Sequence, residues 1–275
     1  MTIGGMVWKT GPILDLYDQI AWFREQGLTG VAFHTAPALS GDWASFDVRA
    51  ATEDDRLRLK AAVAGFAEVS VHAEFDNYDV ILSSPNDLVR RASVESLRDS
   101  LDLAAYLGAP VVTVHEGASR AWAPPEMRRE ALARSIGDLA ELAEQRGVDV
   151  AFELTRDYDL VLAAGGPVGV TLDVGHVSFD DGAGYRPFGT IGGLIRHLAA
   201  RLVHVHVHDY EGVHDHLALG AGNLDFADII GGLLDIGYAG MLCLELSPAH
   251  TVAEDYPRSA ALLRALIAEH GHGEP

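Results

Sequence analysis

The 275-residue sequence predicts an α/β fold of the (β/α)8 TIM barrel type, and two observations favour it. Short apolar runs alternate with longer helical patterns along the whole chain, which is typical of a parallel sheet with crossover helices. Polar residues close most of these runs, as they do at the active-site face of such barrels. An open doubly wound sheet is the alternative, but no GxGxxG motif follows the first run, which disfavours a dinucleotide-binding sheet.

The apolar runs supply eight expected strands, and a helical pattern follows each of them. The expected strands lie at Ile3–Trp8, Thr29–His34, Glu68–Glu74, Pro110–His115, Val148–Glu153, Val168–Asp173, Leu202–His208 and Gly240–Leu246. The expected helices lie near Ile13–Gln26, Glu53–Ala67, Pro85–Leu107, Pro124–Arg146, Arg156–Ala163, Gly189–Ala200, Asp225–Ile236 and Tyr256–His270.

Several helix ends carry the residues that such ends prefer. Thr52 is followed three residues later by Asp55, a capping box that begins the second helix. Pro85 and Pro124 suit a first turn, where a missing amide hydrogen costs little. Glycines that favour a left-handed backbone follow four helices, at Gly27, Gly108, Gly147 and Gly237. We therefore expect a single barrel domain over residues 1–275.

Composition narrows the classes of partner. The formal net charge is −20, which disfavours nucleic acid and anionic membranes. Cys243 is the only cysteine, so an internal disulfide and a cysteine-based zinc site are excluded. No signal peptide and no apolar run of membrane-spanning length are expected. We expect a cytoplasmic protein that acts on a small molecule, with a homo-oligomer left open.

The stretch Leu202–Gly222 holds five of the 13 histidines. His204, His206 and His208 alternate with apolar residues, a strand pattern that places the three rings on one face. Asp209 and a glycine-punctuated loop follow. The pattern predicts either metal ligands at the C-terminal mouth of a strand or histidines that fill a core layer.

Polar residues close seven of the eight expected strands. A carboxylate at the end of an apolar run is costly to bury unless it is paired or bound to a cation. Several such residues at C-terminal strand ends converge on the barrel face that carries active sites. The set consists of His34, Glu74, His115, Glu153, Asp173, His208 and Glu245.

Four successive strands predict a metal site. Glu153, Asp173 and Glu245, with one histidine of the HVHVH run, offer three carboxylates and an imidazole. Such ligands suit one divalent metal ion, Mn²⁺, Mg²⁺, Co²⁺ or Zn²⁺, in an open site. The alternative is a group of carboxylates that share protons without a metal, but it leaves the histidines without a role.

Several motifs resemble those of the xylose isomerase-like barrels, the superfamily of sugar-phosphate isomerases/epimerases and endonuclease IV. LDVGH at 172–176 resembles the sixth-strand motif of that superfamily. HVHD at 206–209, with DHL and LGAG after it, resembles the seventh strand and its loop. CLEL at 243–246, VAFEL at 150–154 and VVTVHEG at 111–117 extend the similarity over strands three to eight.

The metal ligands that the resemblance implies are Glu153, Asp173, His206 and Glu245. Among the histidines of the strand, His206 is chosen because it stands three residues before Asp209, as the ligand of the family does. His208 faces the same way, so the choice rests on the resemblance alone. The resemblance also implies that Glu153 and Glu245 act as the catalytic acid–base pair.

Further histidines match positions that bind additional zinc ions in endonuclease IV-like members. They are His72, His115 and His216. His214 stands where those enzymes carry an aspartate, and in single-metal isomerases such positions line the substrate pocket. The resemblance therefore implies substrate contacts at these positions and at His176, and it allows a second zinc. A hydrogen bond to Asp173 is the alternative role for His176.

Arg156 and Arg186 are candidates to bind an anionic group of the substrate, with a surface position as the alternative. The glycine-rich loop over 180–187 is a candidate lid. Three tryptophans could form walls of a sugar pocket or simply pack in the fold. They are Trp8, Trp43 and Trp122.

The sequence thus predicts a divalent-metal-dependent isomerase or epimerase that acts on a sugar, sugar phosphate or keto-polyol through a metal-stabilised enediolate. The first alternative is an endonuclease IV-like multinuclear zinc hydrolase or phosphodiesterase. The acidic composition and the scarcity of lysine disfavour a DNA substrate for it. The second alternative is a catalytically inactive metal- or sugar-binding barrel.

Overall fold

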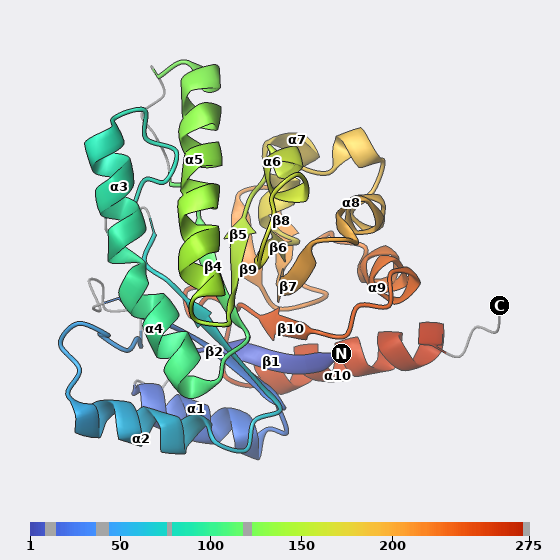
Figure 1. Cartoon of the computed structure of the whole chain (residues 1–275). Helices are drawn as coiled ribbons and strands as arrows, with labels where there is room; N and C mark the ends of the chain where they lie inside the picture. The colour runs from blue at the N-terminus through green and yellow to red at the C-terminus, as the bar shows by residue number, and fades with distance from the viewer. Residues whose placement is uncertain (9–14, 37–43, 76–78, 118–122, 272–275) are drawn as a thin grey trace.

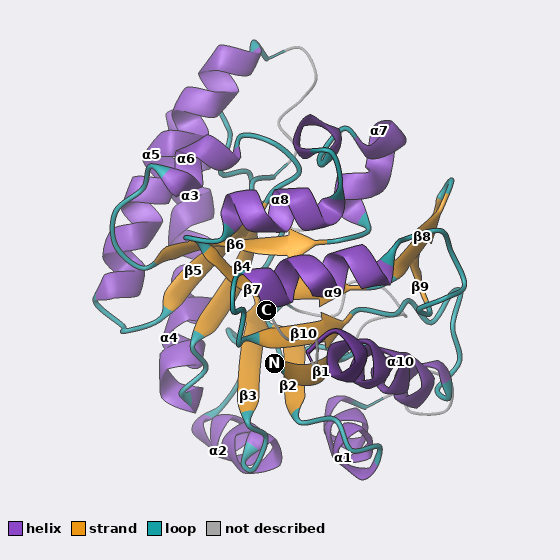
Figure 2. Ribbon diagram, turned by 90° about the vertical axis from the view of Figure 1, so that its right-hand side faces the viewer, coloured by secondary structure: helices purple, strands orange, loops and turns teal. Residues whose placement is uncertain are grey.

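Eight parallel strands close into a barrel in the computed structural model, which describes residues 1–8, 15–36, 44–75, 79–117 and 123–271 (Figures 1 and 2). Around the barrel the strands follow the order of the sequence, and the last strand pairs with the first. The predicted (β/α)8 barrel is therefore confirmed. The strands are β1 (Thr2–Met6), β2 (Gly30–His34), β3 (Glu68–His72), β4 (Val111–His115), β5 (Asp149–Glu153), β6 (Val168–Asp173), β7 (Leu202–Val207) and β10 (Met241–Leu244).

Helices cover the outside of the barrel (Figure 2). The expected helix over 85–107 is two helices, because the N–H of Leu97 donates to the carbonyl of Val94 at 3.3 Å and tightens the backbone there. No helix within the described ranges is long and apolar enough to cross a membrane. The helices are α1 (Leu16–Glu25), α2 (Glu53–Val63), α3 (Asp87–Ser96), α4 (Arg98–Leu107), α5 (Pro125–Glu144), α6 (Tyr158–Leu162), α8 (Ile191–Leu198), α9 (Phe226–Asp235) and α10 (Asp255–Gly271).

Two loops at the C-terminal ends of the strands contain small elements. After β7, where the sequence predicts only a loop, β8 (Asp209–Glu211) and β9 (His214–Leu217) form an antiparallel hairpin. The predicted lid segment contains the short helix α7 (Phe179–Gly182) and the 3₁₀ turn η3 (Arg186–Phe188). Trp43 and Trp122, two of the three candidate pocket walls, lie outside the described residues.

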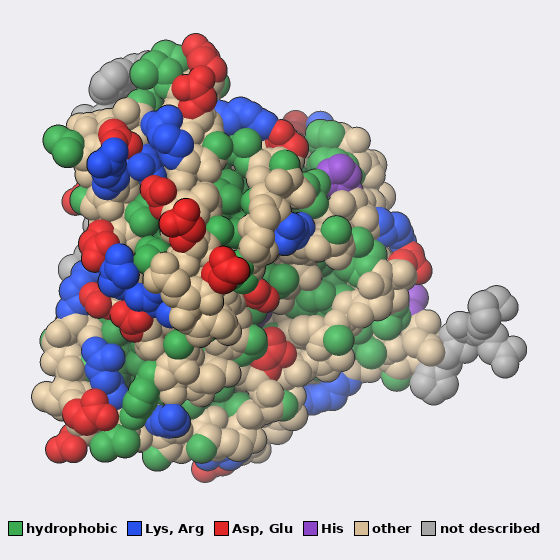
Figure 3. Space-filling view, viewed as in Figure 1, with side chains coloured by type: hydrophobic (Ala, Val, Ile, Leu, Met, Phe, Trp, Pro, Cys, Tyr) green, Lys and Arg blue, Asp and Glu red, His purple; other side chains and the backbone are tan. Residues whose placement is uncertain are grey.

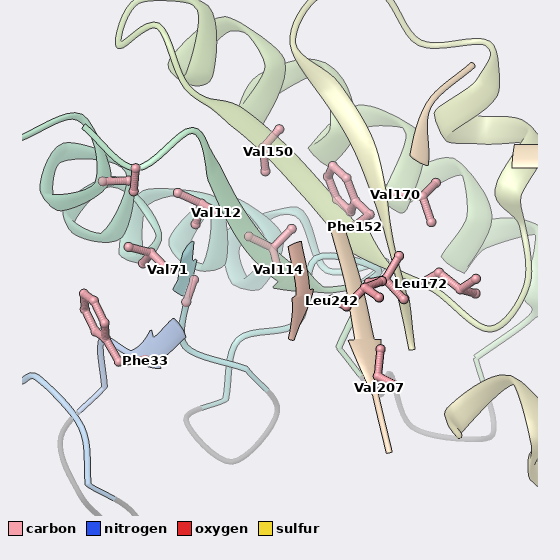
Figure 4. Close-up of a cluster of buried hydrophobic side chains, with 14 of the residues drawn as sticks. Phe33, Val71, Val112, Val114, Val150, Phe152, Val170, Leu172, Val207 and Leu242 are labelled. Atoms are coloured by element: carbon pink, nitrogen blue, oxygen red, sulfur yellow. The ribbon is translucent and has the colours of Figure 1, made fainter. Parts of the chain in front are cut away.

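Alternation along the strands sorts apolar side chains outward and polar side chains inward. Val112 of β4 and Leu172 of β6 are fully buried in the apolar cluster that includes helix residues (Figure 4). The intervening Thr113 and Thr171 face the barrel interior, where their hydroxyl oxygens lie 2.9 Å apart across β5. The strand-end residues two positions later therefore also point inward, at the barrel mouth.

Glu74, one of the strand-end carboxylates, is used to hold the structure together. Its buried carboxylate accepts hydrogen bonds from both terminal nitrogens of Arg49, at 2.5 and 2.7 Å. Arg49 also donates to the carbonyl of Ser96 at 3.0 Å. Because both oxygens of Glu74 are bound by Arg49, Glu74 is not available to the group that the other strand-end carboxylates form.

We expect Arg49→Met to lower the free energy of unfolding by about 2 kcal/mol, because it leaves the buried Glu74 carboxylate without its donor. Chemical denaturation of this variant, of Glu74→Gln and of the double variant measures the effect. The double variant should lose less than the sum of the single losses, since the residues are in contact. Additive losses would show that the pair is not coupled.

Candidate metal and active site

The four residues implied as metal ligands meet at one point in the barrel mouth. Glu153 ends β5, Asp173 ends β6, His206 lies in β7 and Glu245 follows β10, and these are neighbouring strands. His206 Nδ1 lies 3.0 Å from Glu245 Oε2, 3.1 Å from Glu153 Oε2 and 3.8 Å from Asp173 Oδ2. All four side chains are buried. The structure thus brings together the three carboxylates and the imidazole.

Each of these residues has at least one buried atom without a well-aligned hydrogen bond to the described part of the chain. These atoms are Glu153 Oε2, Asp173 Oδ2, both ring nitrogens of His206, and Glu245 Oε2. Buried carboxylate oxygens without donors are costly, and native structures rarely keep them without a partner. Carboxylate oxygens and an imidazole nitrogen are donors that Mn²⁺, Co²⁺ and Zn²⁺ accept together. The donor set therefore fits a divalent cation.

The charges in this cluster act on one another. Burial lowers the pKa of His206, but Glu245 and Glu153 outweigh burial and raise this pKa well above its usual range. Burial raises the pKa of Glu245, but His206 outweighs it and holds that pKa well below its usual range. Because a histidine must be neutral to ligate a metal, a bound cation would replace the proton on His206.

His208 is held by its own hydrogen bonds. Its Nδ1 accepts a hydrogen bond from the backbone N–H of His216 at 2.8 Å, so the ring proton lies on Nε2. Nε2 then donates to Asp173 Oδ1 at 2.8 Å. The ring orients Asp173 and leaves its second oxygen free. This arrangement favours His206 over His208 as the metal ligand.

His176 contacts two of the carboxylates. Its backbone N–H donates to Asp173 Oδ1 at 2.7 Å, and its ring Nδ1 lies 2.7 Å from Glu153 Oε1. Burial opposes a charge on this ring, but Asp173 and Glu153 outweigh burial and raise the pKa of His176 to about 10. The alternative role, a bond to Asp173, is present through the backbone. The bond to Glu153 is a contact that the sequence did not predict.

His72 and His115 lie near Oε2 of Glu153, whereas His176 lies near Oε1. Their Nε2 atoms are 3.2 Å apart, and His115 Nε2 lies 3.3 Å from Glu153 Oε2. His72 Nδ1 lies 2.9 Å from the carbonyl of Ala73, to which it donates, so Nε2 of the neutral ring carries a lone pair. Burial lowers the pKa of His72, which favours the neutral ring.

His216 closes the mouth from the β8–β9 hairpin. Its ring stacks on that of His208 at 4.2 Å between centroids and also contacts the ring of Trp8 at 5.0 Å. Its Nε2 lies 4.0 Å from Glu245 Oε2. Asp215, to which the sequence analysis gave no role, lies 3.2 Å from His216 Nδ1. His216 therefore lies where the sequence places it.

The two candidate arginines lie outside this cluster. Arg156 is exposed and lines a separate cavity of about 460 Å³ together with Arg128 and Arg129. Arg186 is exposed and lines another cavity, beside α7. Substrate binding by Arg156 remains a prediction.

Gly175 of the LDVGH motif makes room for His208. A Cβ at this position would lie 1.9 Å from His208 Cε1, far inside van der Waals contact. A larger residue would therefore push His208 away from Asp173. The close approach of another side chain explains a glycine whose role the sequence alone does not disclose.

We expect Gly175→Ala to lower the free energy of unfolding by about 2 kcal/mol, as over-packing of a buried site does. It should also weaken binding of a divalent cation by about tenfold or more, since Asp173 loses its orienting donor. Gly137→Ala in α5 is the control, because its Cβ meets nothing within 4 Å. Equal behaviour of the two variants in calorimetric titration and denaturation would contradict the assigned role.

Comparison with known proteins shows the family of this chain. The family model described as xylose isomerase-like TIM barrel matches residues 20–266. MJ1311, an uncharacterized protein of Methanocaldococcus jannaschii, is 29% identical over an alignment of 199 residues that covers 65% of this chain and 64% of that protein. A ketose 3-epimerase of Arthrobacter globiformis is 27% identical over an alignment of 244 residues that covers 82% of this chain and 77% of that enzyme. The crystal structure of a D-tagatose 3-epimerase-like protein has a TM-score of 0.79 at 21% identity, with 98% of each chain covered. By its sequence and its fold, the chain belongs to the xylose isomerase-like TIM barrels.

Proposed function

We propose that this chain is a divalent-metal-dependent epimerase or isomerase of a ketose or a related hydroxy-ketone. The observation that carries the proposal is the position of two carboxylates beside one imidazole nitrogen. Glu153 Oε2 and Glu245 Oε2 lie 3.1 and 3.0 Å from His206 Nδ1. The relative from Arthrobacter globiformis, a ketose 3-epimerase, supports a ketose as substrate.

The proposed metal ligands are Glu153, Asp173, His206 and Glu245. A divalent cation at these residues would polarise a substrate carbonyl and acidify the neighbouring C–H bond. The surrounding residues place and protect that reaction. His176 and His208 fix one oxygen of Glu153 and of Asp173, and so hold the remaining oxygens toward the mouth.

Glu153 and Glu245 are the proposed acid–base pair. Burial raises the pKa values of both carboxyl groups, but neighbouring histidines outweigh burial and hold both pKa values well below their usual range. In the barrel β6 and β7 separate their strands, so the two side chains approach the mouth from different sides. One residue, as a carboxylate, would remove a proton from one face of the reacting carbon. The other residue, in its protonated carboxylic acid form, would donate a proton to the opposite face, and exchange with solvent would then restore both residues. This is the requirement of an epimerase, whereas a 1,2-isomerase needs only one base.

The mouth histidines would bind the sugar oxygens. His176 is protonated at neutral pH, because its pKa is raised to about 10, and its Nε2 lies 3.9 Å from Asp215 Oδ2. From this position Nε2 can donate to a substrate oxygen. His72, His115 and His216 surround the same space and would contact the remaining hydroxyls.

We expect the purified protein to bind a divalent cation, and its removal by a chelator to lower the melting temperature, since a ligand of the native state stabilises that state. His206→Ala should lose the cation. His208→Ala should bind it about 10–100-fold more weakly, the usual effect of removing the hydrogen-bonding partner of a ligand. Metal analysis and calorimetric titration measure both, with His270→Ala, exposed on α10, as the control. Retention in His206→Ala with loss in His208→Ala would reverse the assignment.

We expect Glu153→Gln and Glu245→Gln each to lower turnover more than about a hundredfold, because glutamine keeps the size and one oxygen but cannot accept the proton. NMR of a panel of ketoses in D₂O follows both product and C–H exchange, and Glu141→Gln, exposed on α5, is the control. For an epimerase, one of the two variants should still exchange the C–H without forming product.

Two results of this NMR experiment would contradict the proposal. Turnover near that of the wild type in either glutamine variant would remove that residue from the mechanism. Metal-loaded wild-type protein that binds a ketose without any C–H exchange would instead be a binding barrel.

A multinuclear zinc hydrolase is the second candidate, and the pair His72 and His115 favours it. Their facing Nε2 atoms, with Glu153 Oε2, form a group that fits a second cation. Two nearby cations are typical of phosphoester hydrolases. Two or more tightly bound zinc ions per chain, hydrolysis of a phosphodiester and no C–H exchange would replace the epimerase proposal.

A further inference from the structure

A cavity of about 950 Å³ lies beside the candidate active site, in the size range of small-molecule sites. One wall is the segment 178–186, which includes α7, and the other is formed by residues around the β8–β9 hairpin and the start of the loop to α9. Both segments project from the end of the barrel at which the strands terminate (Figure 2). None of the proposed metal ligands lines this cavity.

Phe179 connects the cavity to the reaction centre. Its ring lies 5.1 Å from that of His176, whose Nδ1 is 2.7 Å from Glu153. The ring of Phe179 also lies 5.3 Å from the ring of Tyr210, and both residues line the cavity. The cavity and the proposed metal site are therefore linked through the side chains of Phe179 and His176.

The lining combines aromatic rings with polar groups. Phe179, Tyr185 and Tyr210 supply rings, while Arg186 and Asn223 supply donors at its edge. A sugar ring has an apolar C–H face and a rim of hydroxyls, so it packs on aromatic rings and hydrogen-bonds to polar groups beside them. This mixture suits a sugar better than a purely apolar group.

The charges of the lining disfavour a phosphate. Asp180 and Asp181 stand against the single cation Arg186, so the charged side chains of the lining sum to −1. In the view of Figure 3, charged side chains gather over α3, α4 and α5, on the opposite side of the molecule from α7 (Figures 1 and 3). An anionic substituent would meet repulsion here, and a neutral one would not.

The two walls of the cavity have different backbone features. Asp209 accepts hydrogen bonds from the backbone N–H groups of Tyr210, Gly220, Gly222 and Leu224, which holds the wall that carries Tyr210. In the opposite wall, Asp180 and Asp181 have a left-handed backbone conformation, with φ of 51° and 61°. Such strained residues gather at ligand-binding segments.

We propose that this cavity is a subsite for a neutral glycosyl group attached to the ketose, so that the substrate is a ketose glycoside larger than a free monosaccharide. The proposal rests on the proposed function only in that the ketose occupies the metal site. Tyr210 and Phe179 stack on the glycosyl ring, and Asn223 and Arg186 hydrogen-bond to its hydroxyls.

The test is a binding measurement on the metal-loaded full chain. Calorimetric titration compares D-fructose, D-fructose with a glucosyl group on O6, and D-fructose 6-phosphate. We expect the glucosyl-fructose to bind about tenfold more tightly than fructose, the effect of one well-stacked ring, and the phosphate to gain nothing. Equal affinities, no binding of either sugar, or a gain for the phosphate alone would overturn the proposal.

Variants assign the difference to the cavity. Tyr210→Ala should abolish the advantage of the glucosyl-fructose and leave the affinity for fructose unchanged, whereas Tyr210→Phe should keep the advantage because it keeps the ring. Asn223→Trp, at an exposed position, should fill the cavity and block the glycosyl group. Leu88→Ala, at a residue that is 80% exposed on α3, is the control. An advantage that survives both Tyr210→Ala and Asn223→Trp would place the glycosyl group elsewhere.

Binding is measured without turnover, so the two proposals can fail separately. If the protein binds the glycoside more tightly than fructose but exchanges no C–H, the subsite proposal stands and the epimerase proposal is wrong. If the protein exchanges the C–H of fructose but binds fructose and its glycoside with equal affinity, the epimerase proposal stands and the subsite proposal is wrong.

Discussion

The burial of three carboxylates around one imidazole is the constraint on which the barrel mouth depends. Like charges so close together repel one another strongly in an interior of low dielectric. Glu153 and Asp173 each have one oxygen held by a histidine and one without a well-aligned hydrogen bond in the described chain. The histidines thus supply part of the compensating charge and direct the remaining oxygens to a common point. A cation bound there would supply the rest, so the proposed metal would stabilise the folded structure as well as take part in the proposed chemistry.

Another buried carboxylate, that of Asp209, stabilises the loop next to this group. By accepting four backbone N–H groups it fixes the loop after β7. That loop carries His216, whose N–H sets the tautomer of His208, and His208 in turn orients Asp173. Loop, histidine and ligand therefore form one continuous chain of hydrogen bonds. The same loop forms one wall of the proposed glycosyl subsite, so the proposed sites for the sugar and for the metal share one support.

The three alternating histidines of β7 show how depth in the barrel separates residues that look alike in sequence. His204 is fully buried below the mouth, and burial holds its pKa well below the usual range, so it is a neutral core residue. His206 lies among the carboxylates, and His208 lies above them in the support of Asp173. The core-layer interpretation thus fits His204, whereas the ligand interpretation stays a proposal for His206.

The sequence by itself determined the barrel and the group of strand-end residues at its mouth, because both follow from local periodicity and from the fact that parallel strands end on one face. Only the tertiary structure decided the pairings within that group. Asp173 and His208 are 35 residues apart, and Glu153 and His176 are 23 apart. Glu74, alike in sequence, is instead bound by Arg49. Such choices depend on which side chains from distant segments come within hydrogen-bonding distance of one another, and no pattern along the chain records those distances.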